Sequence, residues 1–74
     1  MNIYQFAVSD GYNFEPYVFI KKITAKSLND CKDCIVRWIF NTWEDIDFHS
    51  EEYDDIIDEL KNFNIILGNI EEID

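Results

Sequence analysis

Two stretches near the start of the chain are mainly apolar with polar residues between them, "NIYQFAVS" at 2–9 and "PYVFIKKIT" at 16–24, although Lys21 and Lys22 break the alternation in the second. Both stretches are rich in aromatic and β-branched residues, which favour strands. The segment between them, "DGYNFE", contains the dipeptide Asp10-Gly11, a common turn signal. We therefore predict an antiparallel hairpin with a loop of about six residues.

The pattern that follows the hairpin is helical. Ser27 is a favourable N-cap residue, and Asp30 stands three positions later, as in a capping box. We expect this helix to run to about Thr42 or Glu44. Its apolar side chains cover an arc of about 200°, wider than the roughly 100° stripe of an ordinary surface helix; they are Leu28, Cys31, Cys34, Ile35, Val36, Trp38, Ile39 and Trp43. Either a second helix covers the remainder of this arc, or a partner does.

A second helix is predicted in the stretch "SEEYDDIIDEL", with Ser50 as its N-cap. Its apolar residues form a narrow stripe with the spacing i, i+3, i+4, i+7; they are Tyr53, Ile56, Ile57 and Leu60. Asn64 is suited to the left-handed conformation that ends a helix. Residues 65–73 are predicted to form a third strand, with Gly68 as a bulge or kink.

This order of elements predicts an α+β domain of two layers, ββααβ, in which two helices cover one face of a three-stranded, mainly antiparallel sheet. A chain of 74 residues is long enough for a single domain, which we expect to comprise residues 1–74. No apolar run approaches the roughly 18 residues needed to span a bilayer, and two cysteines are too few for a disulfide framework. We expect a cytoplasmic protein with no membrane contact.

The net charge of −10 is unevenly distributed along the chain. Residues 1–40 contain four acidic and five basic residues, a balance of +1, whereas residues 41–74 contain twelve acidic residues and one basic residue, a balance of −11. Charge segregated in this way indicates an electrostatic face. Such a face repels nucleic acid and attracts basic protein surfaces, so we predict a protein partner and no direct binding of nucleic acid.

The charge is densest on the predicted second helix, where six acids fill an arc of about 160° opposite the apolar stripe; they are Glu51, Glu52, Asp54, Asp55, Asp58 and Glu59. Over the helical rise of about 12 Å this gives about one charge per 2 Å, close to the one per 1.7 Å of duplex DNA. Further acids flank the helix in sequence and are predicted to extend the face; they are Glu44, Asp45, Asp47, Glu71 and Glu72. A solvated surface without a ligand is the alternative interpretation.

In size and charge pattern, across the whole chain, the sequence resembles the small acidic phage-encoded inhibitors of the DNA-mimic and anti-CRISPR class. The resemblance rests on the carboxylate-rich segment and involves no aligned motif. It implies an inhibitor whose anionic face occupies the basic nucleic-acid-binding site of a bacterial enzyme. The partner implied is therefore a basic nucleic-acid-binding protein, and the location implied is the host cytoplasm if the chain is phage-encoded.

Catalytic, metal and cofactor sites are not predicted. His49 is the only histidine and has no nucleophile motif to pair with, so we interpret it as a residue flanking the second helix. Cys31 and Cys34 match Cys-x-x-Cys, but we expect them to be core residues, because Cys31 lies about four residues inside the helix and not at its N-terminus. A zinc site would need two more ligands.

Three aromatic residues are candidate anchors for a partner, because aromatic side chains carry much of the energy at interfaces; they are Tyr12, Phe14 and Trp43. Trp38 and Trp43 are about 140° apart around a continuous helix. One of them is therefore expected on the surface unless the first helix is covered on both sides. An alternative function follows from this arc, namely a non-enzymatic adaptor or dimerisation module whose first helix binds a protein partner, with a homodimer as one form.

Overall fold

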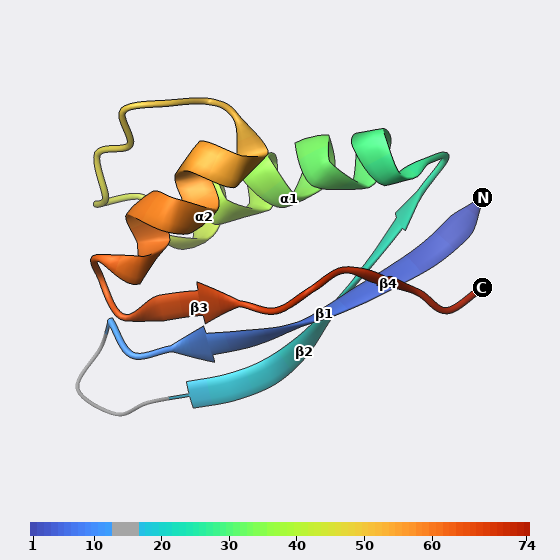
Figure 1. The fold of residues 1–74 in the computed structure, drawn as a ribbon, viewed down its shortest axis with the longest axis horizontal. Helices are drawn as coiled ribbons and strands as arrows, with labels where there is room; N and C mark the ends of the chain where they lie inside the picture. The colour runs from blue at the N-terminus through green and yellow to red at the C-terminus, as the bar shows by residue number, and fades with distance from the viewer. Residues whose placement is uncertain (13–16) are drawn as a thin grey trace.

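The computed structural model describes residues 1–12 and 17–74, which form one sheet and two helices in two layers (Figure 1). Both helices lie on the same side of the sheet. The elements in chain order are β1 (Asn2–Asp10), β2 (Tyr17–Ala25), α1 (Leu28–Thr42), α2 (Tyr53–Lys61), β3 (Ile65–Leu67) and β4 (Glu71–Glu72). The predicted α+β class is therefore confirmed, with the predicted order except that the last strand is split.

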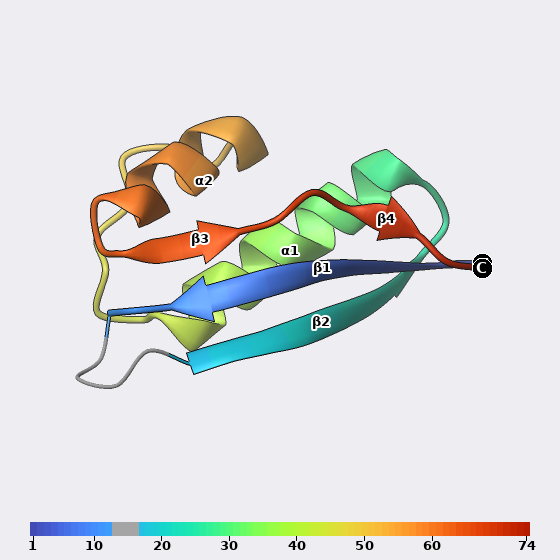
Figure 2. The same ribbon diagram turned by 60° about the horizontal axis from the view of Figure 1, so that its bottom comes forward.

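β1 is the central strand of the sheet and pairs antiparallel with every other strand (Figure 2). On one side it pairs with β2 along its full length, from Asn2 opposite Ala25 to Asp10 opposite Tyr17. On the other side β3 pairs with its C-terminal end and β4 with Tyr4 and Gln5. The predicted hairpin is thus confirmed for the described residues, and the chain end returns along the far side of β1.

The predicted third strand is interrupted after Leu67 and becomes two short strands. The Gly68 N–H donates to the Ala7 carbonyl oxygen at 2.8 Å, and regular pairing resumes only at Glu71. The irregularity expected at Gly68 is present, but it lengthens into a three-residue break. This break places β4 at the opposite end of β1 from β3.

The core lies between the sheet and the two helices. Tyr4, Phe6 and Val8 alternate along β1 and are almost fully buried, because every second residue of a strand faces the same side. α1 contributes a buried stripe of Cys31, Ile35, Val36 and Ile39, and α2 contributes Ile56 and Leu60. The predicted N-cap of α1 is confirmed, since the Ser27 hydroxyl accepts the Asp30 N–H at 3.2 Å.

The apolar arc of α1 is covered within the molecule, and the expectation that Trp38 and Trp43 diverge is wrong. Trp43 is the C-cap residue of α1, and its ψ of 66° is not helical. The direction of its side chain therefore does not follow the regular rotation of the helix. Its ring packs against Trp38 at 5.3 Å between centroids, and its indole N–H donates to Asp10 at 3.2 Å. Phe40 packs against Phe48 of the following loop.

α2 begins later than predicted, at Tyr53, and Ser50 is not its N-cap. The Ser50 hydroxyl accepts the Glu52 N–H at 3.0 Å and donates to Asp55 at 3.1 Å, which closes a local turn before the helix. Glu52 is the N-cap and makes no side-chain capping bond. At the other end, Asn64 has φ 61°, which confirms its left-handed conformation. Within the described ranges, neither helix is long and apolar enough to cross a bilayer.

Candidate partner-binding surface

Nine carboxylates lie between Glu44 and Glu59 without an intervening Lys or Arg, and we call them the acidic surface. All but Glu59 are exposed. The loop between α1 and α2 carries five of them, Glu44, Asp45, Asp47, Glu51 and Glu52, and α2 carries Asp54, Asp55, Asp58 and Glu59. Because α2 begins at Tyr53, the predicted row of six acids on one helix is shortened to four, and half of the charge comes from irregular backbone.

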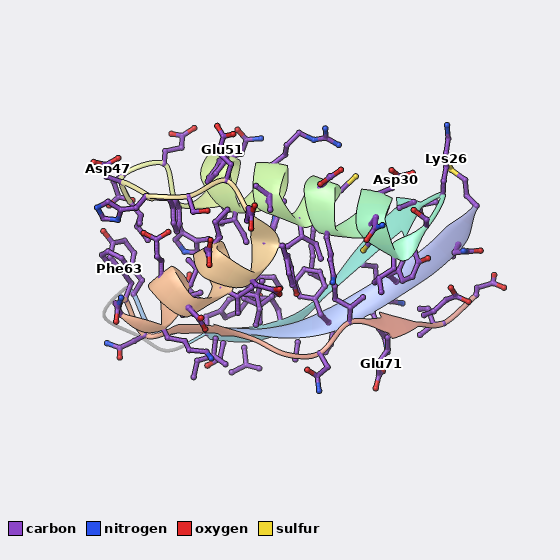
Figure 3. All side chains as sticks on the ribbon, turned by 45° about the horizontal axis from the view of Figure 1, so that its top comes forward. Lys26, Asp30, Asp47, Glu51, Phe63 and Glu71 are labelled. Carbon is purple, nitrogen blue, oxygen red and sulfur yellow. The ribbon has the colours of Figure 1, made fainter. Side chains whose placement is uncertain are left out.

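The loop between α1 and α2, which we call the acidic loop, is held against α1 and the core by its apolar residues. Ile46 is buried at 7% exposure, and Phe48 packs against Phe40 of α1 at 5.5 Å between ring centroids. Figure 3 shows Asp47 and Glu51 on the helix side of the molecule, away from the sheet. The apolar contacts therefore direct the carboxylates of the loop and of α2 to the same layer.

His49 and Glu59 connect the loop to α2. The Glu59 carboxylate accepts the His49 backbone N–H at 2.9 Å and lies 2.7 Å from the ring nitrogen Nδ1. The bond to the backbone N–H lowers the pKa of Glu59, and the ring bond to this carboxylate raises the pKa of His49. The Glu59 carboxylate is therefore hydrogen-bonded within the molecule. It contributes less than the neighbouring carboxylates to the negative charge that the acidic surface presents to a partner.

This pair gives a pH-dependent contribution to stability with a defined sign. The raised pKa of His49 stabilises the fold fully below its ordinary value of 6.5, and this is lost as the pH rises through the raised value. The lowered pKa of Glu59 stabilises the fold above its ordinary value of 4.5, and this is lost as the pH falls through the lowered value. The pair therefore contributes most between about pH 4.5 and 6.5.

An NMR titration of the His49 ring tests this contact. We expect a pKa above 6.5 in the native chain and a clear decrease toward 6.5 in Glu59→Gln, because the substitution removes the main cause of the shift. Asp47→Asn is the control, since Asp47 is only a minor cause. An unchanged His49 pKa in Glu59→Gln would show that the ring does not contact Glu59 in solution.

The other carboxylates of the acidic surface differ in how far they are engaged. Asp55 accepts the Ser50 hydroxyl, and Asp45 accepts the Tyr12 hydroxyl at 2.7 Å. Asp58 is 3.5 Å from Lys61 Nζ with both side chains exposed, a type of pair that contributes little. Five carboxylates of the acidic surface accept no hydrogen bond from the described residues 1–12 and 17–74; they belong to Glu44, Asp47, Glu51, Glu52 and Asp54.

Glu71 and Glu72 do not extend the acidic surface, which corrects the sequence-based expectation. β4 pairs with Tyr4 and Gln5 near the start of β1, at the opposite end of the sheet from β3 and α2. Figure 3 shows Glu71 on the side of the sheet away from the helices, and its carboxylate accepts the Gln5 amide at 3.3 Å. The strand break after Leu67 is the structural reason.

The three candidate anchors have different positions. Tyr12 is 36% exposed and packs edge-on against Phe63 at 5.7 Å, and its bond to Asp45 raises the pKa of its hydroxyl. Trp43 is 4% exposed, so it is a core residue and has almost no surface to offer a partner. Phe14 lies outside the described residues. Only Tyr12 is thus placed at the margin of the acidic surface, through Asp45.

A hollow of about 510 Å³ lies between the end of α1 and the acidic loop. Phe40, Ile46 and Phe48 supply apolar lining, and Glu44 and Glu51 supply carboxylates. An apolar lining with carboxylates at its margin suits the side chain of Lys or Arg, which combines an aliphatic stem with a cationic head. Sequence spacing does not predict this hollow, because Phe40 and Phe48 meet only through the path that the loop takes in three dimensions.

The cysteines and potential metal ligands add no site. Cys31 is buried, as predicted, and burial raises the pKa of its thiol, whereas Cys34 is half-buried and near Arg37. No cluster of three metal-ligating side chains is found in the described part of the chain.

Comparison with protein-family models, curated proteins and solved structures finds no significant match to this chain.

Proposed function

We propose that the protein is an acidic inhibitor that binds a basic nucleic-acid-binding protein, with the carboxylates of the acidic surface in the place of phosphates. The partner class is a bacterial enzyme acting on DNA or RNA in the cytoplasm, as in anti-restriction or anti-CRISPR inhibition. The observation that carries the proposal is the grouping, within the acidic surface, of five exposed carboxylates to which no group of the described residues donates. No enzymatic activity is proposed.

The cost of maintaining these charges supports this function over a surface without a ligand. Asp54 and Asp58 are like charges at i, i+4, as are Asp55 and Glu59, and each such pair destabilises a helix by about 0.2–0.5 kcal/mol. A lysine at either position would relieve the repulsion. Grouped charge of one sign also accelerates encounter with an oppositely charged site.

The alternative adaptor function would use the apolar arc of α1, and the structure gives it less support. The arc is packed against β1, α2 and the acidic loop. Leu28, at 46% exposure, is the one large apolar side chain of α1 among the exposed hydrophobic residues. We therefore place the partner-binding site on the acidic surface.

Capture from a bacterial lysate by the immobilised chain tests the proposal. We expect the captured proteins to be nucleic-acid-binding proteins that are released by raised salt and by competing duplex DNA or RNA, because both compete for the same cationic sites. The variant Glu51→Gln/Asp54→Asn is expected to capture much less. The matched control Asp33→Asn/Glu72→Gln removes the same charge outside the acidic surface and is expected to capture normally.

Two outcomes would contradict the proposal. One is capture that competing nucleic acid leaves unchanged, which would mean that the bound site is not a nucleic-acid site. The other is equal loss of capture in the two double variants, which would mean that total charge matters and the position of the charge does not.

A further inference from the structure

The face of the sheet opposite the helices is largely apolar and is not covered by the part of the chain that the structure describes, and we call it the open face. Val18 and Ile20 of β2 and Ile66 of β3 are each more than half exposed there, at 67%, 57% and 54%. Their register partners on β1, Ser9 and Ala7, belong to the same face, because alternate residues of a strand point to the same side. Grouped apolar exposure of this kind marks an interaction surface.

The register arranges the open face in rows that run across the three strands. Starting at the end of the sheet where β3 pairs with β1, the rows are Val18–Ser9–Ile66, Ile20–Ala7–Gly68 and Lys22–Gln5–Glu71. The first row has an apolar residue at both edges. The third row has opposite charges at its two edges, with Lys22 on β2 and Glu71 on β4.

The middle row combines a projection with a recess. Ile20 projects from β2, while on the other side of Ala7 the chain has Gly68, which has no side chain, at the strand break. A hollow of about 300 Å³ lies at this point, and its lining includes Ile20 itself as well as Ala7, Gly68 and Glu71. Ile20 and Gly68 thus border the same hollow from the two sides of the central strand.

We propose that two copies of this chain pack face to face through their open faces, related by a two-fold axis parallel to β1. Such an axis keeps each row at its level and exchanges the two edges of the sheet. Ile20 then enters the hollow beside the partner's Gly68, Val18 lies over the partner's Ile66, and Lys22 faces the partner's Glu71. The surface is therefore complementary to itself in both shape and charge, as a two-fold interface requires.

The size of the open face indicates a weak dimer. Nine residues of β1 at about 3.4 Å each and three strands at about 4.8 Å spacing give a footprint of about 30 by 15 Å. This is below the roughly 800 Å² per partner of a standard stable interface. We therefore expect a dissociation constant above about 1 μM, the weak limit of the range that standard-sized interfaces cover.

The dimer leaves the acidic surface free, because that surface lies in the helix layer and the open face lies on the opposite side of the sheet. The inference is therefore independent of the proposed function, and salt distinguishes the two interactions. Screening weakens contact between the acidic surface and a basic partner, whereas it reduces the general repulsion between two copies that each carry a charge of −10.

Sedimentation equilibrium of the full chain from about 5 to 500 μM tests the dimer, with a concentration range that spans the expected affinity. We expect the average mass to rise from 8.9 kDa toward twice that value. Ile20→Asp should raise the dissociation constant at least about tenfold, since it places a charge in the hollow. Leu28→Asp, the same kind of change at an exposed apolar residue of α1, should leave it unchanged. Circular dichroism verifies that each variant is folded.

Charge exchange provides a second test that does not depend on Ile20. Lys22→Glu and Glu71→Lys should each weaken the dimer, and the double variant should restore it, because the two residues are on non-adjacent strands of one chain and meet only across the interface. A chain that remains at 8.9 kDa at all concentrations overturns the proposal. So does a dimer that Ile20→Asp leaves intact, or one in which the double variant is weaker than both single variants.

Discussion

Reversing two charges of the acidic surface, as Glu51→Lys with Asp58→Lys, is expected to weaken binding of the captured nucleic-acid-binding protein by about 100-fold. Each reversal replaces an attraction by a repulsion at a basic site, and a loss of about 1.4 kcal/mol per site corresponds to a factor of ten. Both side chains are exposed, so the fold should be retained. The affinity is measured by isothermal titration at two salt concentrations.

The matched control for this experiment is Asp33→Lys with Glu72→Lys, which changes the net charge of the chain by the same amount outside the acidic surface. We expect a loss of less than about threefold, arising from the change in long-range attraction alone. We also expect the salt dependence of binding to become less steep only in the variant of the acidic surface. Equal losses in the two variants would contradict a localised site.

Trp43→Ala is expected to destabilise the fold by about 3–5 kcal/mol, the usual cost of removing a large aromatic side chain from a core. Trp43 is 4% exposed and contacts Trp38, and its indole N–H is bonded to Asp10. A domain of this length has a total stability of about 4–11 kcal/mol, so the variant should lose a large part of its free energy of unfolding. Urea denaturation followed by circular dichroism measures the change.

The conservative change Trp43→Phe separates packing from hydrogen bonding. It keeps an aromatic ring beside Trp38 and removes the N–H that Asp10 accepts, and we expect a smaller cost of about 1–2 kcal/mol. If Trp43 were instead a surface anchor for the partner, Trp43→Ala would reduce binding and leave the urea midpoint unchanged. That result would contradict the position of Trp43 described above.

The elements of this fold were predictable where local chemistry and periodicity agree. The alternation in β1 and β2, the Ser27 cap and the left-handed Asn64 each follow from the residue type at one position and its immediate neighbours. The two-layer arrangement then follows from the need to bury one face of the sheet and one stripe of each helix.

The start of α2 was not predictable in this way, because Ser50 has two ways to use its hydroxyl. A serine can cap a helix or close a turn with the backbone N–H two residues later, and here it closes a turn with Glu52. The shift moves Glu51 and Glu52 off the helical row. The inferred match to the linear charge of DNA, which assumed one continuous helix from Glu51 to Glu59, therefore does not hold for a single helix face.

The placement of Trp43, Glu71 and His49 depended on tertiary contacts that sequence spacing does not contain. Trp43 turns inward because the helix ends at Thr42, and Glu71 moves to the open face because the third strand breaks after Leu67. The sequence predicts His49 only as a residue that flanks α2, but in the structure its ring contacts the carboxylate of Glu59, ten residues later. A lone histidine before an acidic helix was the one available signal for this contact.

The most direct test of the acidic surface as the binding site is amide hydrogen exchange of the chain alone and in complex with a captured partner. We predict that added protection is concentrated in residues 44–59, around the loop and the exposed side of α2, and that competing duplex DNA or RNA removes it. Protection confined to β2 and β4, with residues 44–59 exchanging as in the free chain, would contradict the account.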